Sequence, residues 1–134
     1  MWRGASRVAD WPAALRGQLL DGGLAGGHIY WGLRPQGAPL PALVLTAVGG
    51  TIGRTVEGDA DLRRSTIQVD AWAATHRDAW LLIEAVLAAV AAPFARDGIR
   101  FASAGQDAPR TSSEEAADKT TLFRASADLN FWHD

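Results

Sequence analysis

The sequence contains no cysteine among its 134 residues. Disulfides, thiolate zinc sites and cysteine nucleophiles are therefore excluded, and the redox compartment is left undetermined. Lysine is nearly absent too, since Lys119 is the only one, and the net charge is −2. Because sequence-independent binding to nucleic acid depends on clustered basic side chains, the composition gives no indication that DNA binding is the main activity.

Long hydrophobic runs are also missing. The longest apolar stretch, residues 85–95, is interrupted by Pro93 and is shorter than the roughly 18 residues of a membrane span. The first ten residues contain no hydrophobic signal core, so we expect a soluble cytoplasmic protein. The length fits one domain with one core, residues 1–134.

Catalytic motifs are absent from the sequence. His28, His76 and His133 are far apart in the chain, and no G-x-S-x-G elbow accompanies them. No H-E-x-x-H motif or histidine cluster indicates zinc. We therefore interpret the histidines as structural or surface residues, and we predict no enzymatic activity.

Neither the glycine-rich stretches nor the acidic residues form a recognisable ligand site. Residues 22–27 lack the Lys-Ser/Thr of a phosphate-binding loop, and residues 49–53 open no predicted helix. Glu57, Asp59 and Asp61 alternate like ligands of a hard cation, but the rest of a calcium loop is missing. The sequence therefore predicts no cofactor and no bound metal.

Hydrophobic periodicity predicts one α+β domain, with a mostly antiparallel sheet, two helices packed on one face, and the order α-β-β-β-α-β-β. The predicted elements cover residues 10–20, 28–33, 43–48, 65–73, 75–96, 99–104 and 120–132. Asp10 is the predicted N-cap residue of the first helix. Residues 51–61 are predicted to form a hairpin arm or mobile loop, and residues 105–118 a polar loop.

The second predicted helix is the clearest element. Thr75 is a good N-cap residue, and Asp78 stands in the first turn, near the positive end of the helix. The predicted apolar stripe consists of Trp80, Ile83, Leu87, Val90 and Phe94. Residues 85–95 carry no charge, so this helix is predicted to bury one face on the sheet and another against the first helix or a neighbouring subunit.

Tryptophan is abundant, with six residues in this short chain. Trp72 and Trp132 fall on the polar registers of their predicted strands. Two interpretations stay open: they cover sheet edges or lie under loops, or they anchor a subunit interface, where tryptophan is enriched.

Several segments together resemble the tail-completion, or tail-terminator, proteins of long-tailed phages. These are the strand IQVDAWA at residues 67–73, the helix that begins RDA at 77–79, the strand HIY at 28–30 and the closing strand LFRASADL at 122–129. The resemblance covers roughly residues 10–132. Related subunits also occur in gene transfer agents.

The resemblance implies a structural subunit of a virion or phage-like particle. Such subunits form a ring, typically of six copies, that caps the head-proximal end of the tail tube, ends its polymerisation and joins it to the head connector. The implied partners are other copies of the chain, the major tail-tube protein and a head connector or stopper protein, while DNA passes through the lumen without specific binding. The family has no catalytic residues to carry over.

The resemblance implies that the two predicted loops, residues 51–61 and 105–118, contact other subunits. Their acidic residues are expected to contact these neighbours or line the lumen. The expected partner-contact residues are Arg54, Glu57, Asp59, Asp61, Trp72, Arg110, Glu114, Glu115 and Trp132. The alternatives are another head–tail adaptor or stopper, or a small-ligand-binding α+β domain. The last would need a cleft with convergent polar groups, for which the sequence has no candidate.

Overall fold

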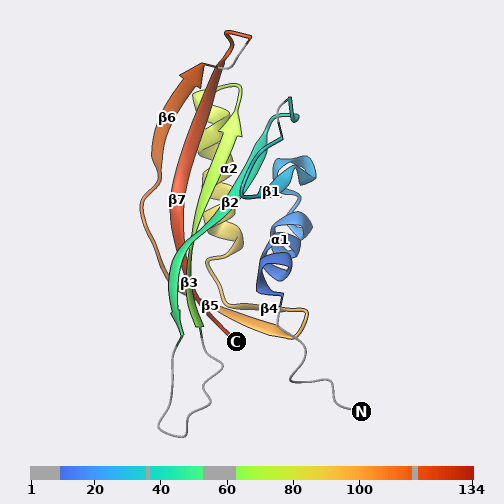
Figure 1. The fold of residues 1–134 in the computed structure, drawn as a ribbon, viewed down its shortest axis with the longest axis vertical. Helices are drawn as coiled ribbons and strands as arrows, with labels where there is room; N and C mark the ends of the chain where they lie inside the picture. Colours follow the sequence, from blue (N-terminus) through green and yellow to red (C-terminus); the bar gives the residue numbers. More distant parts are fainter. Residues whose placement is uncertain (1–9, 36, 53–62, 116–117) are drawn as a thin grey trace, which may run out of the picture.

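The computed structural model describes residues 10–35, 37–52, 63–115 and 118–134. Two α-helices, one short 3-10 helix and seven strands follow one another along the chain (Figure 1). The order is α1 (Trp11–Asp21), η1 (Leu24–Gly27), β1 (Ile29–Trp31), β2 (Ala42–Ile52), β3 (Arg63–Ala73), α2 (His76–Ala89), β4 (Phe94–Arg96), β5 (Ile99–Gln106), β6 (Arg110–Glu115) and β7 (Thr121–His133).

All seven strands belong to one sheet with the order β1-β2-β3-β7-β5-β4, and β6 also pairs with β7. The β1–β2 pair is parallel, and every other pair is antiparallel. One edge of β7 is shared by two partners, because β5 pairs with residues 129–133 and β6 with residues 121–126. The predicted α+β class with a mostly antiparallel sheet is confirmed.

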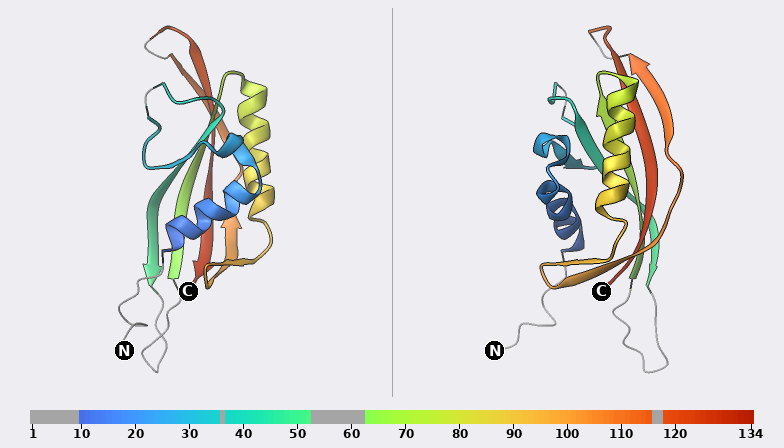
Figure 2. Two further views of the ribbon diagram at one scale, coloured as in Figure 1. Left: turned by 90° about the vertical axis from the view of Figure 1, so that its right-hand side faces the viewer. Right: turned by 180° about the vertical axis from the view of Figure 1, so that it is seen from behind.

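Both helices lie on the same face of the sheet (Figure 2). The strands alternate as predicted, so every second side chain of β3 and β7 points toward the helices and is buried. The core-facing residues are Ile67, Val69, Ala71 and Ala73 on β3, and Ala125, Ala127, Leu129 and Phe131 on β7. Helix α2 lies across these two strands and leaves the opposite face of the sheet uncovered by helices.

Side-chain caps start both helices, as the sequence predicts. The Asp10 carboxylate accepts a hydrogen bond from the backbone N–H of Ala13 at 3.1 Å, and the Thr75 hydroxyl accepts one from Asp78 at the same distance. At the end of α1, Gly23 has a φ of +71°, a conformation that glycine adopts without strain. The helix boundaries therefore depend largely on local contacts.

Replacement of Thr75 by alanine removes the N-cap acceptor of α2. We expect the free energy of unfolding to fall by about 1 kcal/mol, because one backbone N–H of the first turn loses its partner. Urea denaturation of the wild-type and variant proteins measures the change. Thr75→Ser retains the hydroxyl and serves as the control, so an equal loss in both variants contradicts a role for the cap.

The second helix ends earlier than predicted, and its buried face includes Ile83, Leu87 and Val90 of the predicted stripe but not Trp80. It stops at Ala89, and Phe94 belongs instead to β4, which forms a hairpin with β5. Pro93 disfavours helical geometry at the residue before it, so the predicted extension to residue 96 is wrong. Trp80, predicted in the core, is 37% exposed, while Ala79, Leu82, Ile83 and Val86 are buried.

The predicted element order lacks two strands, β4 and β6. β6 lies within residues 105–118, which the sequence assigns to a loop. Its six side chains are all exposed, so it carries no apolar alternation that a sequence pattern reveals. The predicted end of the second strand at Gly49 is also wrong, because β2 continues to Ile52 past a bulge between Ala47 and Gly49.

Candidate functional site

Five of the predicted partner-contact residues are described by the structure. Trp72 lies on β3, Trp132 on β7, and the other three, Arg110, Glu114 and Glu115, on β6. Arg54, Glu57, Asp59 and Asp61 lie outside the described residues. The five described residues lie on two parts of the molecule that the core leaves uncovered: the open face of the sheet with its β6 edge, and the end near the C-terminus.

Trp72 is held on the open face of the sheet by two arginines. Its ring centroid lies 5.6 Å from the guanidinium carbon of Arg34 and 5.3 Å from that of Arg124. Arg124 is the direct cross-strand partner of Trp72 on β7. Such cation–π contacts orient the half-buried indole against its own sheet. The tryptophan and the two guanidinium groups form one surface cluster.

A polar network connects β3 and β7 on the same face. Asp70, only 8% exposed, accepts hydrogen bonds from the Ser126 hydroxyl at 2.5 Å and from the Gln68 amide at 3.2 Å. Thr66 donates to the Asn130 side chain at 2.6 Å. Short polar side chains at paired positions satisfy one another here, so the open face is polar and ordered without a covering layer.

β6 is connected to β7 through polar side chains as well as through the ladder. Arg110 forms an ion pair with Asp128 at 3.5 Å, and Arg124 donates from Nε to the Ser112 hydroxyl at 3.1 Å. Glu114 and Glu115 are exposed at the end of this strand. The structure therefore places the predicted acidic residues on an edge strand instead of a loop.

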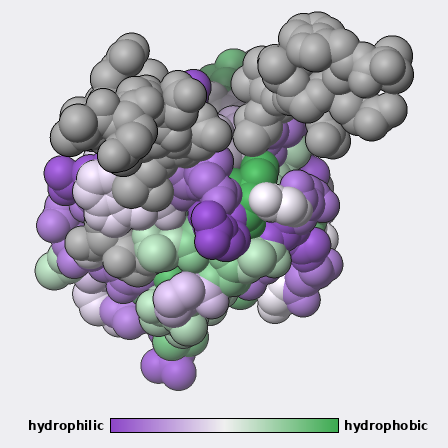
Figure 3. Space-filling view, turned by 90° about the horizontal axis from the view of Figure 1, so that it is seen from below, coloured by the Kyte–Doolittle hydropathy of each residue, from purple (hydrophilic) through white to green (hydrophobic). Residues whose placement is uncertain are grey.

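Trp132 lines an apolar groove of about 510 Å³ at the end of the molecule that carries the C-terminus. Its ring is 37% exposed. The groove is lined by Pro93, Phe94, Ala95, Arg100, Phe101, Ala102, Trp132, His133 and Asp134. Figure 3 shows hydrophobic surface among hydrophilic residues at this end. The sequence contained no signal for this groove, because β4 and β5 form it together with the end of β7.

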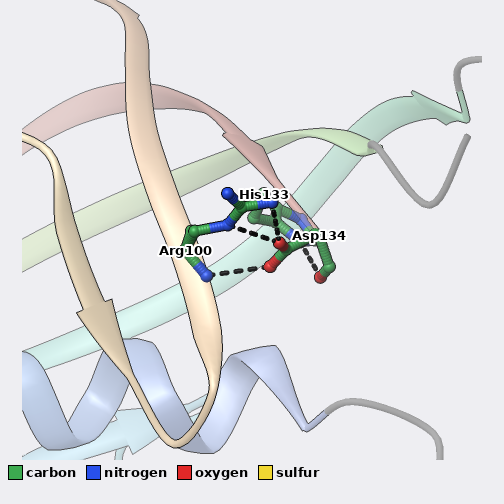
Figure 4. Close-up of polar contacts among 3 residues, drawn as sticks. All are labelled: Arg100, His133 and Asp134. Carbon is green, nitrogen blue, oxygen red and sulfur yellow. Dashed lines mark hydrogen bonds and ion pairs between the residues drawn. The ribbon is translucent and has the colours of Figure 1, made fainter.

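The polar groups of the groove are paired with one another (Figure 4). Asp134 accepts hydrogen bonds from the backbone N–H and from Nε of Arg100, both at 2.8 Å. These bonds and the positive charge of Arg100 hold the pKa of Asp134 below its ordinary value. The two charged side chains at the rim of the groove, Arg100 and Asp134, therefore neutralise each other.

His133 is a buried structural residue. It is 1% exposed, and Nε2 lies 2.8 Å from the Ser65 hydroxyl. Its ring lies 5.0 Å from that of Trp11 and 5.5 Å from that of Phe101, measured between centroids. Burial lowers the pKa of His133, and the positive charge of Arg63 lowers it further.

We expect the burial of His133 to make stability dependent on pH. Because its folded-state pKa is below the ordinary 6.5, the unfolded chain binds the proton more readily, and the free energy of unfolding falls as the pH drops below 6.5. Urea denaturation at several pH values between about 7.5 and 5.5 measures the slope. His133→Gln should reduce the slope, whereas His76→Gln, at an exposed position, should retain it. Equal slopes in His133→Gln and the wild type rule out His133 as the origin of the pH dependence.

Within residues 10–35, 37–52, 63–115 and 118–134, no group of three or more His, Cys, Asp or Glu residues is arranged to hold a metal ion. In the same part of the chain, no helix combines the length and hydrophobicity needed to cross a membrane.

Comparison with known proteins identifies the family. No curated protein matches the sequence. A chain from a solved structure described as "Virion of native gene transfer agent (GTA) particle" has a similar fold, with a TM-score of 0.54 and 15% identity over 91% of this chain and 93% of that one. The model of the family "Tail completion protein gp17" matches residues 13–134, which is nearly the whole domain. The chain therefore belongs to the tail completion protein gp17 family, and it is a structural protein of a phage-like tail, not an enzyme.

Proposed function

We propose that the protein forms a ring that caps the head-proximal end of the tail tube, ends tube polymerisation and joins the tail to the head connector. The observation that carries this proposal is the family match, which extends over nearly all of the domain. The resemblance found in the sequence supports a ring of six copies. The further partners are the major tail-tube protein and a head connector or stopper protein, with DNA passing through the lumen.

The shape of the fold supports a role in assembly. Its helices cover one face of the sheet, while the other face is polar and open, and an apolar groove lies at one end. A ring subunit needs separate surfaces for its neighbours, the tube and the connector. The open face with Trp72, the β6 edge and the groove with Trp132 provide three such surfaces.

A deletion strain tests the proposal. Without this gene, we expect overlong tails that lack heads in cryo-images of the particles, because tube growth is not ended and the connector has no docking surface. Re-expression of the wild-type chain should restore tail length and attachment. Particles of normal length and normal attachment from the deletion strain contradict the proposal.

The main alternative is another adaptor or stopper of the head–tail joint. It predicts tails of normal length that remain unattached, so tail length in the same images separates the two functions. Binding of a small ligand is a less favoured reading. The groove near Trp132 has suitable size, but its charged groups, Arg100 and Asp134, are already paired with each other.

The acidic end of β6 is the part of the surface that we expect to contact neighbours or line the lumen. Replacing Glu114 and Glu115 with alanine should impair ring assembly or DNA passage, measured as a loss of DNA-delivering particles. Glu84→Ala on the exposed side of α2 is the matched control. Wild-type assembly and DNA delivery by the Glu114/Glu115 variant exclude this role.

A further inference from the structure

We propose that neighbouring copies of this chain join edge to edge, with β6 of one copy pairing with residues 46–52 of β2 in the next copy. The inference rests on the ring of the proposed function and specifies the contact that builds it. The basis is a pair of strand edges at opposite margins of the sheet, neither of which has a partner strand among the described residues.

The first edge belongs to β6. One side of β6 pairs with β7, and in the described chain no strand pairs with the other side. Natural proteins protect such edges with lysine, proline, bulges or inward-pointing charges. The charged residues of β6, Arg110, Glu114 and Glu115, lie at its two ends. Its middle, Thr111 to Ser113, has small uncharged residues, and its pairing with β7 shows no register shift. This edge is therefore available as a template for another strand.

The second edge belongs to β2. β1 pairs only with Leu43, Val44 and Leu45, and within the described residues no strand covers the same side of residues 46–52. The whole of β2 contains neither a charged residue nor proline, and Val48 is 51% exposed. The bulge between Ala47 and Gly49 is the one protective feature, and pairing with β3 continues on both sides of it.

The two edges match in length and direction. β6 has six residues, and the segment 46–52 is one residue longer, which the bulge absorbs. β2, β3, β7 and β6 are joined by successive antiparallel pairs, so β2 and β6 run in opposite directions. Copies placed side by side around an axis thus present antiparallel edges, the more stable arrangement. A contact between two different edges is head-to-tail and closes into a ring when the rotation allows.

The register of the strands is compatible with closure of the copies into a ring. Arg110 lies level with Val44 through the pairs Arg110–Ser126, Ser126–Asp70 and Asp70–Val44. To pair with residues 46–52 of the next copy, β6 must shift by seven residues, or ~23 Å along the strands. Each copy contributes about four strand spacings, or ~19 Å across them. This stagger tilts the strands by about 50° from the ring axis, slightly more than the roughly 35–45° typical of closed sheets.

Engineered cysteines test the contact directly, because the chain has none of its own. Ser113→Cys and Val48→Cys are introduced together, and Thr111→Cys with Val48→Cys covers a register shifted by two residues. After oxidation of purified particles, we expect the chain of at least one pair to migrate as multimers on a non-reducing gel. Ser113→Cys with Glu84→Cys on α2 is the matched control and should stay monomeric.

Two results overturn the inference. One is a chain that is present in particles but forms no multimers with either pair, and the other is cross-linking of β6 to a different particle protein. Neither result affects the proposed function, which is tested separately by tail length and head attachment in the deletion strain.

Proline substitution in β6 provides a second readout. In an antiparallel ladder, adjacent residues direct their N–H groups to opposite sides. One of Ser112→Pro and Ser113→Pro therefore breaks the ladder to β7, while the other removes an N–H from the free edge. We expect the variant with the higher Tm to be absent from particles. If that variant folds as the wild type does and enters particles normally, the edge does not pair.

Discussion

Replacement of Phe131 by alanine is expected to lower the free energy of unfolding by about 3–5 kcal/mol. Phe131 is fully buried at the end of β7, where its ring meets Phe101 and Phe94 edge to face at centroid distances of 5.8 and 6.3 Å. Phe94 and Phe101 stack on each other at 4.7 Å. Loss of one ring leaves a cavity among the others, and the cost is a large part of the stability of a small domain.

Urea denaturation monitored by tryptophan fluorescence measures this loss. The control is Trp132→Ala, at the next residue of the same strand but on the opposite face, where the ring is partly exposed. We expect the control to lose less than half as much stability. Comparable losses in both variants contradict the assignment of Phe131, rather than Trp132, to the core.

Replacement of Ala127 by leucine is expected to destabilise the protein by about 1–3 kcal/mol, although it adds apolar surface. Ala71 and Ala73 on β3 and Ala125 and Ala127 on β7 are fully buried on the face toward the helices. Helix α2 contacts both strands. The small side chains leave the helix close to the sheet, so a larger one forces the two layers apart.

The same denaturation measurement tests this prediction. Ala88→Leu makes the identical change on the exposed side of α2 and should alter the free energy of unfolding by less than about 0.5 kcal/mol. A stability of Ala127→Leu equal to or above that of the wild type shows that the alanines do not set the spacing between helix and sheet.

Most of the fold was predictable from local sequence patterns. β3 and β7 show strict alternation, and Thr75 and Asp10 cap the helices as expected. The exposure of Trp80 on α2 was not predictable. The helix is apolar on several sides, so stripes containing Trp80 or Leu82 satisfy the same periodicity, and the position of the sheet selects between them.

The candidate contact surfaces were predictable only in part. Trp72 was singled out from its polar register, but its position between Arg34 and Arg124 depends on chain segments far apart in the sequence. β6 was missed because its stability comes from backbone bonds to β7 and not from buried side chains. The groove beside Trp132 required the hairpin of β4 and β5, which the sequence did not indicate.

The sequence by itself determined the α+β class, the two helix starts and the two long alternating strands, and its resemblance to tail-completion proteins pointed to the family. These features depend on residues within a few positions of one another, where side-chain period and capping act. Only the tertiary structure decided that Trp80 of the apolar helix α2 is exposed and that residues 110–115 form a strand. It also placed two strand edges, without a partner strand in the described part of the chain, at opposite margins of the sheet. Such features depend on which distant segments pair, and backbone hydrogen bonds between polar strands leave no pattern in the side chains.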